Sequence, residues 1–126
     1  LRPHGAIITQ STSPYYTTET FRSIEKTLQK AKFNTLPIHN HVYTFGEWSW
    51  IIGSKKLSSD KIKSRIHKID VTDIEDLKWL NQDALLLITS FGKDLIPIDT
   101  SKIMVNTIHN PVAYKYYENG DWSFEF

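Results

Sequence analysis

The first half of the chain shows two hydrophobic periods, one typical of strands and one typical of a helix. Residues 6–9 form an apolar, β-branched run after Gly5, which predicts a short strand buried on both faces. Residues 34–42 and 48–53 predict two more strands, and the short link between them permits only antiparallel pairing. Pro37 places the first of these two at a sheet edge or a bulge, because proline donates no hydrogen bond to a neighbouring strand.

A helix is predicted between the first strand and the second. Apolar residues recur there on one helical face, namely Phe21, Ile24, Leu28 and Ala31. Polar and charged side chains take the other face, namely Arg22, Glu25, Lys26, Gln29 and Lys30. We therefore expect a helix packed on a sheet. Its start is expected at Ser13–Pro14, with Thr17 or Thr18 as the alternative.

The second half of the chain predicts short helices. Residues 58–60 can cap one helix, whose apolar positions are Ile62 and Ile66. Thr72 and Glu75 fit a capping box before a second helix, which would carry Leu77 and Leu80.

Residues 81–90 are expected to form a third short helix, ended by Gly92. Periodicity does not separate helix from strand within residues 84–88. Residues 94–97 are expected to be irregular, and residues 101–117 to form a tail of extended and helical pieces. The fold class is therefore α/β, with residues 1–56 forming the sheet unit and residues 57–126 a helical and irregular extension that packs on it.

Composition narrows the functional classes. The 126 residues are 40% hydrophobic, which is enough to fill a core. The net charge of +1 does not indicate binding to nucleic acid or to an anionic membrane. Cysteine is absent, so disulfides and cysteine-ligated zinc are excluded. No apolar run approaches the roughly 20 residues of a membrane helix. The opening Leu1–Ile8 reads as the middle of a fold, and we expect the chain to be a piece of something longer.

Polar residues follow the first two strands where each ends. Gln10 follows the first strand, while Tyr43 and Glu47 follow the second. If these strands are parallel, the three side chains lie on one rim, where open α/β sheets bind ligands. Tyrosine offers a π face to a cation and glutamate a countercharge, so the rim would suit an amine. Alternatively, Tyr43 and Phe45 only close a hairpin.

Other chemistry has less support in the sequence. His39 and His41 share one face of a strand and could hold a metal, with Glu47 as the available third ligand; the alternative is that they are ordinary polar residues. The remaining histidines, His4, His67 and His109, are expected at the surface. Neither a Gly-x-Ser-x-Gly elbow nor a Gly-rich phosphate loop occurs.

The first half of the chain resembles the spermidine/spermine synthase family, and in particular the C-terminal part of bacterial spermidine synthase-like proteins. The resemblance rests on Gln10 with the Ser-Thr-Ser-Pro-Tyr-Tyr string of 11–16, on Phe-Arg-Ser-Ile at 21–24 and on Thr-Phe-Gly-Glu-Trp-Ser at 44–49. Weaker matches follow at residues 77–81 and 110–117.

This resemblance implies a Rossmann-like, methyltransferase-type sheet and a reaction. Residues 6–10, 34–42 and 48–54 would be its fifth, sixth and seventh strands, the seventh inserted antiparallel between the other two. The family transfers an aminopropyl group from decarboxylated S-adenosylmethionine to a diamine such as putrescine. By resemblance, Gln10 and Tyr43 line the amine pocket, and Glu47 matches a position where some members have glutamine.

The resemblance also implies what this chain lacks. The family's Gly-rich turn, ribose-binding acid and catalytic aspartate all precede the point where this sequence starts. We therefore expect no catalytic residue, no cofactor site and no metal here, with decarboxylated S-adenosylmethionine as co-substrate of the longer protein only.

Two alternatives are a non-catalytic binding module that keeps the fold and a methyltransferase-like protein with another substrate. We further expect a cytoplasmic protein, and attachment of its longer parent to a membrane through upstream helices stays open. We also expect self-association through an exposed sheet edge, or a homodimer.

Overall fold

The computed structural model of the protein describes residues 1–93, 96 and 99–120. The predicted irregular segment at 94–97 lies largely outside these residues, as do positions 121–126 of the predicted extension. Within them the order of elements is β1 (Ala6–Gln10), α1 (Thr18–Lys30), β2 (Asn34–Val42), β3 (Gly46–Ser54), α2 (Ser59–His67), α3 (Gln82–Leu87) and α4 (Val112–Glu118). The described residues thus form a small α/β domain of three strands and four helices.

The three strands form one antiparallel sheet in the order β1-β3-β2. The predicted insertion of the last strand between the other two is therefore confirmed. Because β1 and β2 both run antiparallel to β3, they run parallel to each other and end toward the same edge. Pro37 lies in β2, an edge strand, as its missing N–H requires.

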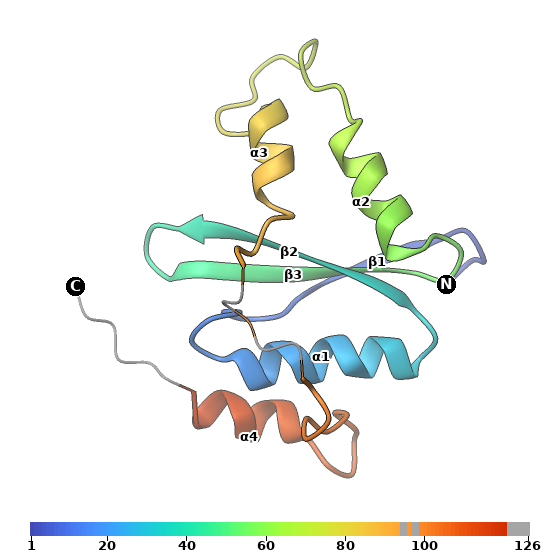
Figure 1. The fold of residues 1–126 in the computed structure, drawn as a ribbon, viewed down its shortest axis with the longest axis vertical. Coiled ribbons are helices and arrows are strands. Elements are labelled where there is room, and N and C mark those ends of the chain that lie inside the picture. The colour runs from blue at the N-terminus through green and yellow to red at the C-terminus, as the bar shows by residue number, and fades with distance from the viewer. Residues whose placement is uncertain (94–95, 97–98, 121–126) are drawn as a thin grey trace.

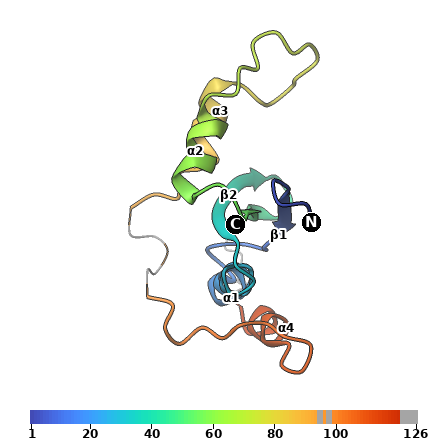
Figure 2. The ribbon, with the colours of Figure 1, turned by 90° about the vertical axis from the view of Figure 1, so that its right-hand side faces the viewer.

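The sheet has α1 on one face and the α2–α3 pair on the other (Figure 1). Figure 2 shows these layers end-on, with α4 on the far side of α1 from the sheet. The core between α1 and the sheet centres on Phe21 and Ile51, which are buried. The predicted helix packed on a sheet is confirmed.

The polar face of α1 is where the C-terminal tail packs. The Ser23 hydroxyl donates to the Met104 carbonyl at 2.7 Å, and the Lys26 ammonium donates to the Ile103 carbonyl at 2.7 Å. The Thr20 hydroxyl donates to the carbonyl of Ala113 in α4. These bonds satisfy backbone carbonyl groups of the tail, which has few backbone hydrogen bonds of its own. The sheet and the tail thus cover α1 on both sides.

Two predicted helix starts are corrected by local hydrogen bonding. The Ser13 hydroxyl accepts from the backbone of Tyr15 and Tyr16, so it closes a turn and α1 begins later, with the alternative Thr17 as N-cap. The helix predicted after Thr72 is absent. Both the backbone N–H and the hydroxyl of Thr72 donate to the Asp70 carboxylate, so this hydroxyl serves a turn instead of a capping box.

Two of the remaining helices, α2 and α3, begin where the sequence predicts. Ser58 caps α2 by accepting from the Lys61 N–H, and Ile62 is buried. Asn81 caps α3 by accepting from the Ala84 N–H at 2.8 Å. The third predicted helix is confirmed, but α3 ends at Leu87 and not near Gly92.

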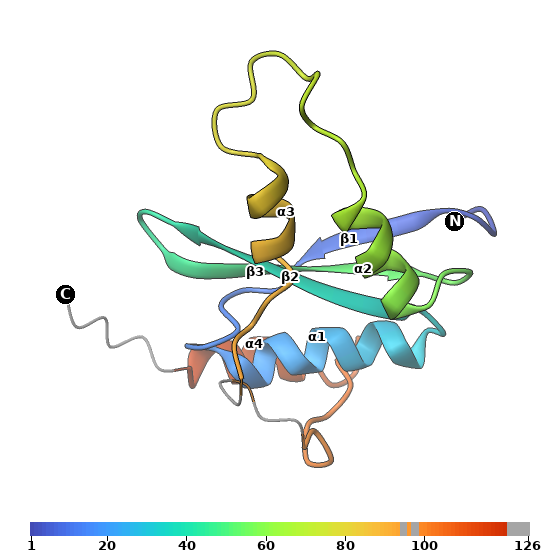
Figure 3. The ribbon, with the colours of Figure 1, turned by 45° about the horizontal axis from the view of Figure 1, so that its top comes forward.

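Residues 59–87, the α2–α3 arm, project away from the sheet (Figure 3). The buried apolar residues of the arm are Ile62, Val71, Ala84 and Leu85. The base of its connecting loop is closed by Gln82, whose side chain bonds to the backbone of Val71 and Ile69. The proposed division at residue 56 falls between β3 and α2, and it stays a prediction.

Candidate functional site

The β2–β3 hairpin extends past the end of β1. Gln10, the last residue of β1, pairs with Trp50, while β2 and β3 stay paired out to Val42 and Gly46. This overhang of four residues is about 13 Å long. The β1–α1 loop runs beside it, since the Ser11 N–H donates to the Ser49 carbonyl at 2.9 Å. The loop and the overhang together form the rim on which polar side chains gather.

Glu47 lies at the centre of this rim, between two histidines. Its Oε2 is 2.8 Å from Nδ1 of His39, and its Oε1 is 3.4 Å from Nδ1 of His41. The His39 side chain is 12% exposed and that of His41 is 59% exposed. The register explains the cluster, because Glu47 pairs directly with His41 and lies diagonally from His39 on the same sheet face.

His39 faces an acceptor at each ring nitrogen. Beyond the Glu47 contact, its Nε2 bonds to the Ser90 carbonyl, and its backbone N–H donates to the Ile88 carbonyl at 2.9 Å. The arrangement holds the His39 ring between the Glu47 carboxylate and the Ser90 carbonyl. It also anchors the chain after α3 to the β2 edge.

Tyr15 reaches the same cluster from the β1–α1 loop. Its hydroxyl donates to the Phe91 carbonyl at 3.2 Å, and its ring meets that of His39 edge-on, with centroids 6.3 Å apart. Burial, and to a lesser degree the nearby Glu47 charge, raise the pKa of the Tyr15 phenol above its usual value. The phenol is thus held neutral, as a hydrogen-bonding group and an aromatic wall.

The loop that carries Tyr15 is fixed by a buried hydroxyl network. Ser49 donates its hydroxyl to the Thr12 carbonyl at 2.7 Å and accepts from the Ser11 hydroxyl at 2.7 Å. Thr12 has a φ of 60°, which is unusual for a β-branched residue and costs about 1–3 kcal/mol. A second bond, between the hydroxyls of Thr12 and Thr17 at 2.5 Å, helps to hold this conformation.

The three residues assigned by sequence do not all meet. The pleat places Glu47 on the face of the sheet that α1 covers, while Gln10 pairs with Trp50 on the opposite face. Tyr43 is 98% exposed at the hairpin tip, where its ring meets that of His41 edge-on at 6.2 Å between centroids. The structure thus brings Tyr43 and Glu47 together through His41, and Gln10 lies apart.

A cavity of about 360 Å³ adjoins the cluster, lined in part by Phe91, whose ring also meets His39 at 4.4 Å. It opens between α1 and the chain after α3. Its carboxylate, Glu25, is bound by the Arg22 guanidinium at 2.7 Å. The cavity therefore offers a largely apolar surface, and Glu47 is the better countercharge for a bound amine.

The geometry of the described residues does not match the alternative of a metal site at His39 and His41. No three His, Cys, Asp or Glu side chains in the described parts of the chain converge on a possible ion. His39 and His41 both direct Nδ1 at Glu47, so the three groups bind one another. His67, expected at the surface, is half-buried and bonds through Nε2 to the Thr89 hydroxyl at 2.8 Å.

Sequence reasoning missed Tyr15, and it grouped His39, His41 and Glu47 only as possible ligands of a metal, not as partners of one another. Tyr15 belongs to the Ser-Thr-Ser-Pro-Tyr-Tyr string, but its chemical role depends on a turn that the string does not specify. The His39 pairing had a usable signal. Residues 39, 41 and 47 flank a short hairpin link, and a register around that link would have brought the three together.

Comparison with known proteins gives relatives but no family model that matches. The chain is 34% identical over 118 residues to polyamine aminopropyltransferase 2 of Aquifex aeolicus, which covers 93% of this chain and 22% of that protein. It is 29% identical to the polyamine aminopropyltransferase of Oceanobacillus iheyensis, over 94% of this chain and 22% of the relative. It is 31% identical to that of Shewanella oneidensis, over 94% and 20%.

The match extends beyond the first half of the chain, where the sequence resemblance was strongest, to nearly all of it. The chain spans about a fifth of the length of these curated relatives. In the described residues, no helix has the length and apolar character needed to cross a membrane. The predicted resemblance is confirmed, and the chain is a homologue of the C-terminal part of the bacterial polyamine aminopropyltransferases.

Proposed function

We propose that this chain forms the amine-side wall of a spermidine synthase-like aminopropyltransferase and is inactive by itself. The observation that carries the proposal is the similarity to polyamine aminopropyltransferases along nearly the whole chain. The Glu47 cluster adds chemical support, because a carboxylate flanked by aromatic rings is a suitable site for an ammonium group. The longer protein would carry these strands as the end of a Rossmann-like sheet.

Glu47 would hold the end of the diamine that does not react. A diamine such as putrescine carries two ammonium groups, and one must lose its proton before it can attack. The base for that step belongs to the catalytic aspartate of the family, outside this chain. Glu47 would pair with the other ammonium, with Tyr15 and Tyr43 beside it and Gln10 contacting the substrate from a separate position.

His41 is the partner that a substrate would displace. Its nitrogen is farther from Glu47 than that of His39, and its side chain is more exposed. His39 is held on three sides by Glu47, Ser90 and Ile88. An ammonium would therefore take Oε1 of Glu47 from His41, while His39 continues to orient the carboxylate through Oε2.

The assembly and location also stay proposals. β1 pairs only with β3 within the described residues, and Ile8 on it is exposed. This free edge would receive either another strand of the longer protein or a second copy. A cytoplasmic location suits a chain without cysteine. The alternative function is a non-catalytic module that keeps the fold for binding.

The test is calorimetric titration of the longer protein with putrescine, with and without Glu47→Ala. We expect the variant to bind putrescine roughly 10-fold more weakly or worse, because a partly buried charged hydrogen bond is lost. Glu75→Ala is the matched control, since Glu75 is exposed in the arm loop and should leave affinity unchanged.

Two further outcomes separate the site from the function. Equal putrescine affinity of the wild-type protein and the Glu47→Ala variant would contradict only the proposed role of Glu47, and not the enzyme proposal. If the longer protein binds no diamine and releases no methylthioadenosine from decarboxylated S-adenosylmethionine, the enzyme proposal fails and the binding module stands. Methylthioadenosine release by the 126-residue chain alone would contradict its predicted inactivity.

A further inference from the structure

Residues 88–91, which follow α3, form a strap between the arm and the sheet. The chain that leaves α3 passes β2 on its way to α1 (Figures 1 and 3). Within the described residues β2 pairs only with β3, and on the other side of β2 the His39 N–H donates to the Ile88 carbonyl at 2.9 Å. The strap therefore lies directly beside the strand that carries the histidines of the Glu47 cluster.

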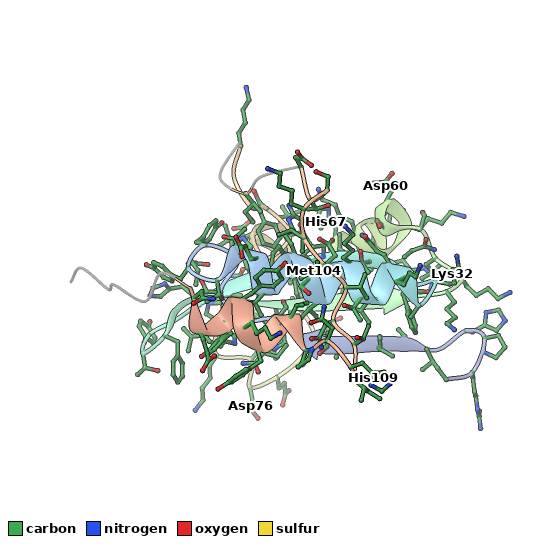
Figure 4. The ribbon with its side chains drawn as sticks, turned by 90° about the horizontal axis from the view of Figure 1, so that it is seen from below. Lys32, Asp60, His67, Asp76, Met104 and His109 are labelled. Atoms are coloured by element: carbon green, nitrogen blue, oxygen red, sulfur yellow. The ribbon has the colours of Figure 1, made fainter. Side chains whose placement is uncertain are left out.

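The near end of the strap is fixed to both helices of the arm. Thr89 is 8% exposed, and its hydroxyl donates to the Leu86 carbonyl at 2.9 Å. Nε2 of His67, which Figure 4 labels, is 2.8 Å from the same hydroxyl oxygen. The Ser90 N–H donates to the Leu87 carbonyl at 3.0 Å. The strap is thus held by α2, through His67, as well as by α3.

The far end of the strap contacts two side chains of the Glu47 cluster through one residue, Phe91. Its ring lies 4.4 Å from the His39 ring, centroid to centroid, and its carbonyl accepts from the Tyr15 hydroxyl at 3.2 Å. Its ring also meets that of the buried Phe21, with centroids 6.1 Å apart. Phe91 therefore connects the core beneath α1 to both of these neighbours of Glu47.

The direction of the Glu47 carboxylate depends on such neighbours. The side chain of Glu47 is 31% exposed near the start of β3, and a glutamate there has several rotamers available when nothing holds it. Its Oε2 is 2.8 Å from Nδ1 of His39. A hydrogen bond to a ring that is itself packed in place selects one direction for the carboxylate.

We propose that Phe91 is a positioning residue for the diamine, because it fixes the His39 ring and, through that ring, the Glu47 carboxylate. The inference rests on the proposed function, in which this carboxylate binds the ammonium that does not react. The arm then becomes part of the site, since it holds the other end of the strap. By linkage, a diamine bound to Glu47 stabilises the docked strap in return.

The test is steady-state kinetics of the longer protein with Phe91→Ala. We expect KM for putrescine to rise roughly 5-fold or more, as for other pairs of residues in contact, while kcat and KM for decarboxylated S-adenosylmethionine stay unchanged. A residue that only supports the fold would lower kcat by reducing the folded fraction and would leave both KM values unchanged. That result would overturn the proposal. The matched control is Val112→Ala, at a buried position of α4, which should leave both KM values unchanged.

A double-mutant cycle shows whether Phe91 acts through the cluster. In a protein that already carries His39→Ala or Glu47→Ala, adding Phe91→Ala should not raise KM for putrescine further, because the group that Phe91 positions is already absent. Equal rises with and without the first substitution would contradict the proposal. If Phe91→Ala does not fold, Phe91→Leu also lacks the aromatic ring and should give the same pattern to a smaller degree.

Hydrogen exchange gives a measurement that does not depend on turnover. Saturating putrescine should slow exchange of the His39 and Ser90 amides in the wild-type longer protein, and it should not do so in the Glu47→Ala variant. Unchanged exchange in the wild type would count against the strap. If Glu47→Ala raises KM for putrescine and Phe91→Ala does not, only the positioning role fails. If the wild type neither binds nor converts a diamine, the proposed function fails first.

Discussion

The sheet with α1 and the α2–α3 arm both bury apolar side chains, but they differ in how they place the others. Around α1, hydroxyl groups are buried and hydrogen-bonded, among them Ser11, Ser23 and Ser49. On the arm, large apolar groups such as Trp79 and Leu87 are outside. Polar side chains are therefore buried where other segments of the chain cover them and supply hydrogen-bond partners, whereas large apolar side chains on the outer surface of the arm stay exposed.

This contrast has a consequence for stability. The sheet and α1 share a core and are tied to the tail by hydrogen bonds that span most of the sequence, such as Thr20 to Ala113. The arm has four core residues and a loop closed mainly by Gln82. We expect the arm to open locally at a lower free energy than the sheet, which hydrogen exchange would show.

The largest expected effect comes from the core beneath α1. Phe21→Ala removes a ring that is 1% exposed and should lower the free energy of unfolding by about 3–5 kcal/mol. Leu86→Ala, on the exposed side of the arm, should change it by no more than about 0.5 kcal/mol. Urea unfolding followed by circular dichroism measures both. Equal losses would mean that the arm and the sheet share one core.

A smaller effect should come from the hydroxyl network. Ser49→Ala leaves the buried Ser11 hydroxyl without its partner and leaves the Thr12 carbonyl with the Ser49 N–H as its donor, so it should cost about 1–3 kcal/mol. The matched control is Ser64→Ala, at an exposed position of α2, which should cost no more than about 0.5 kcal/mol. If Ser49→Ala were as harmless as the control, the network would not hold the loop.

The sequence predicts most of the sheet because its signals there are local. Residues 34–42 need only their own pattern and Pro37 to be recognised as an edge strand, and the short link fixes the antiparallel pairing. The arm was harder. Thr72 and Glu75 match a helix start, but the structure uses Thr72 in a turn with Asp70, and the motif does not contain that competing bond.

The candidate site was predictable only in part, because its parts come from four segments. The position of Glu47 near a strand end is visible in the sequence, but its partners depend on register and pleat. One residue of register decides that Glu47 and His39 share a face while Gln10 lies on the other. The position of Tyr15 depends, in addition, on the strained turn at Thr12, which no local sequence pattern predicts.

The smallest expected effect is the response of the sheet region to alkaline pH. The Tyr15 phenol has a raised pKa, so its contribution to stability is complete below the unfolded value of about 10 and is lost as pH rises through the folded value. Tyr15→Phe lacks this titration, so its urea midpoint should fall less than that of the wild type above about pH 10.

A second variant separates the two causes of the raised pKa. Burial is the larger cause and the charge of Glu47 the smaller, so Glu47→Gln should keep most of the alkaline loss that Tyr15→Phe removes. If Glu47→Gln instead removed the alkaline loss of stability completely, the charge of Glu47 would be the main cause of the raised Tyr15 pKa. Tyr15 would then be coupled mainly to the carboxylate, and occupation of Glu47 by an amine would be readable as a change in Tyr15 titration.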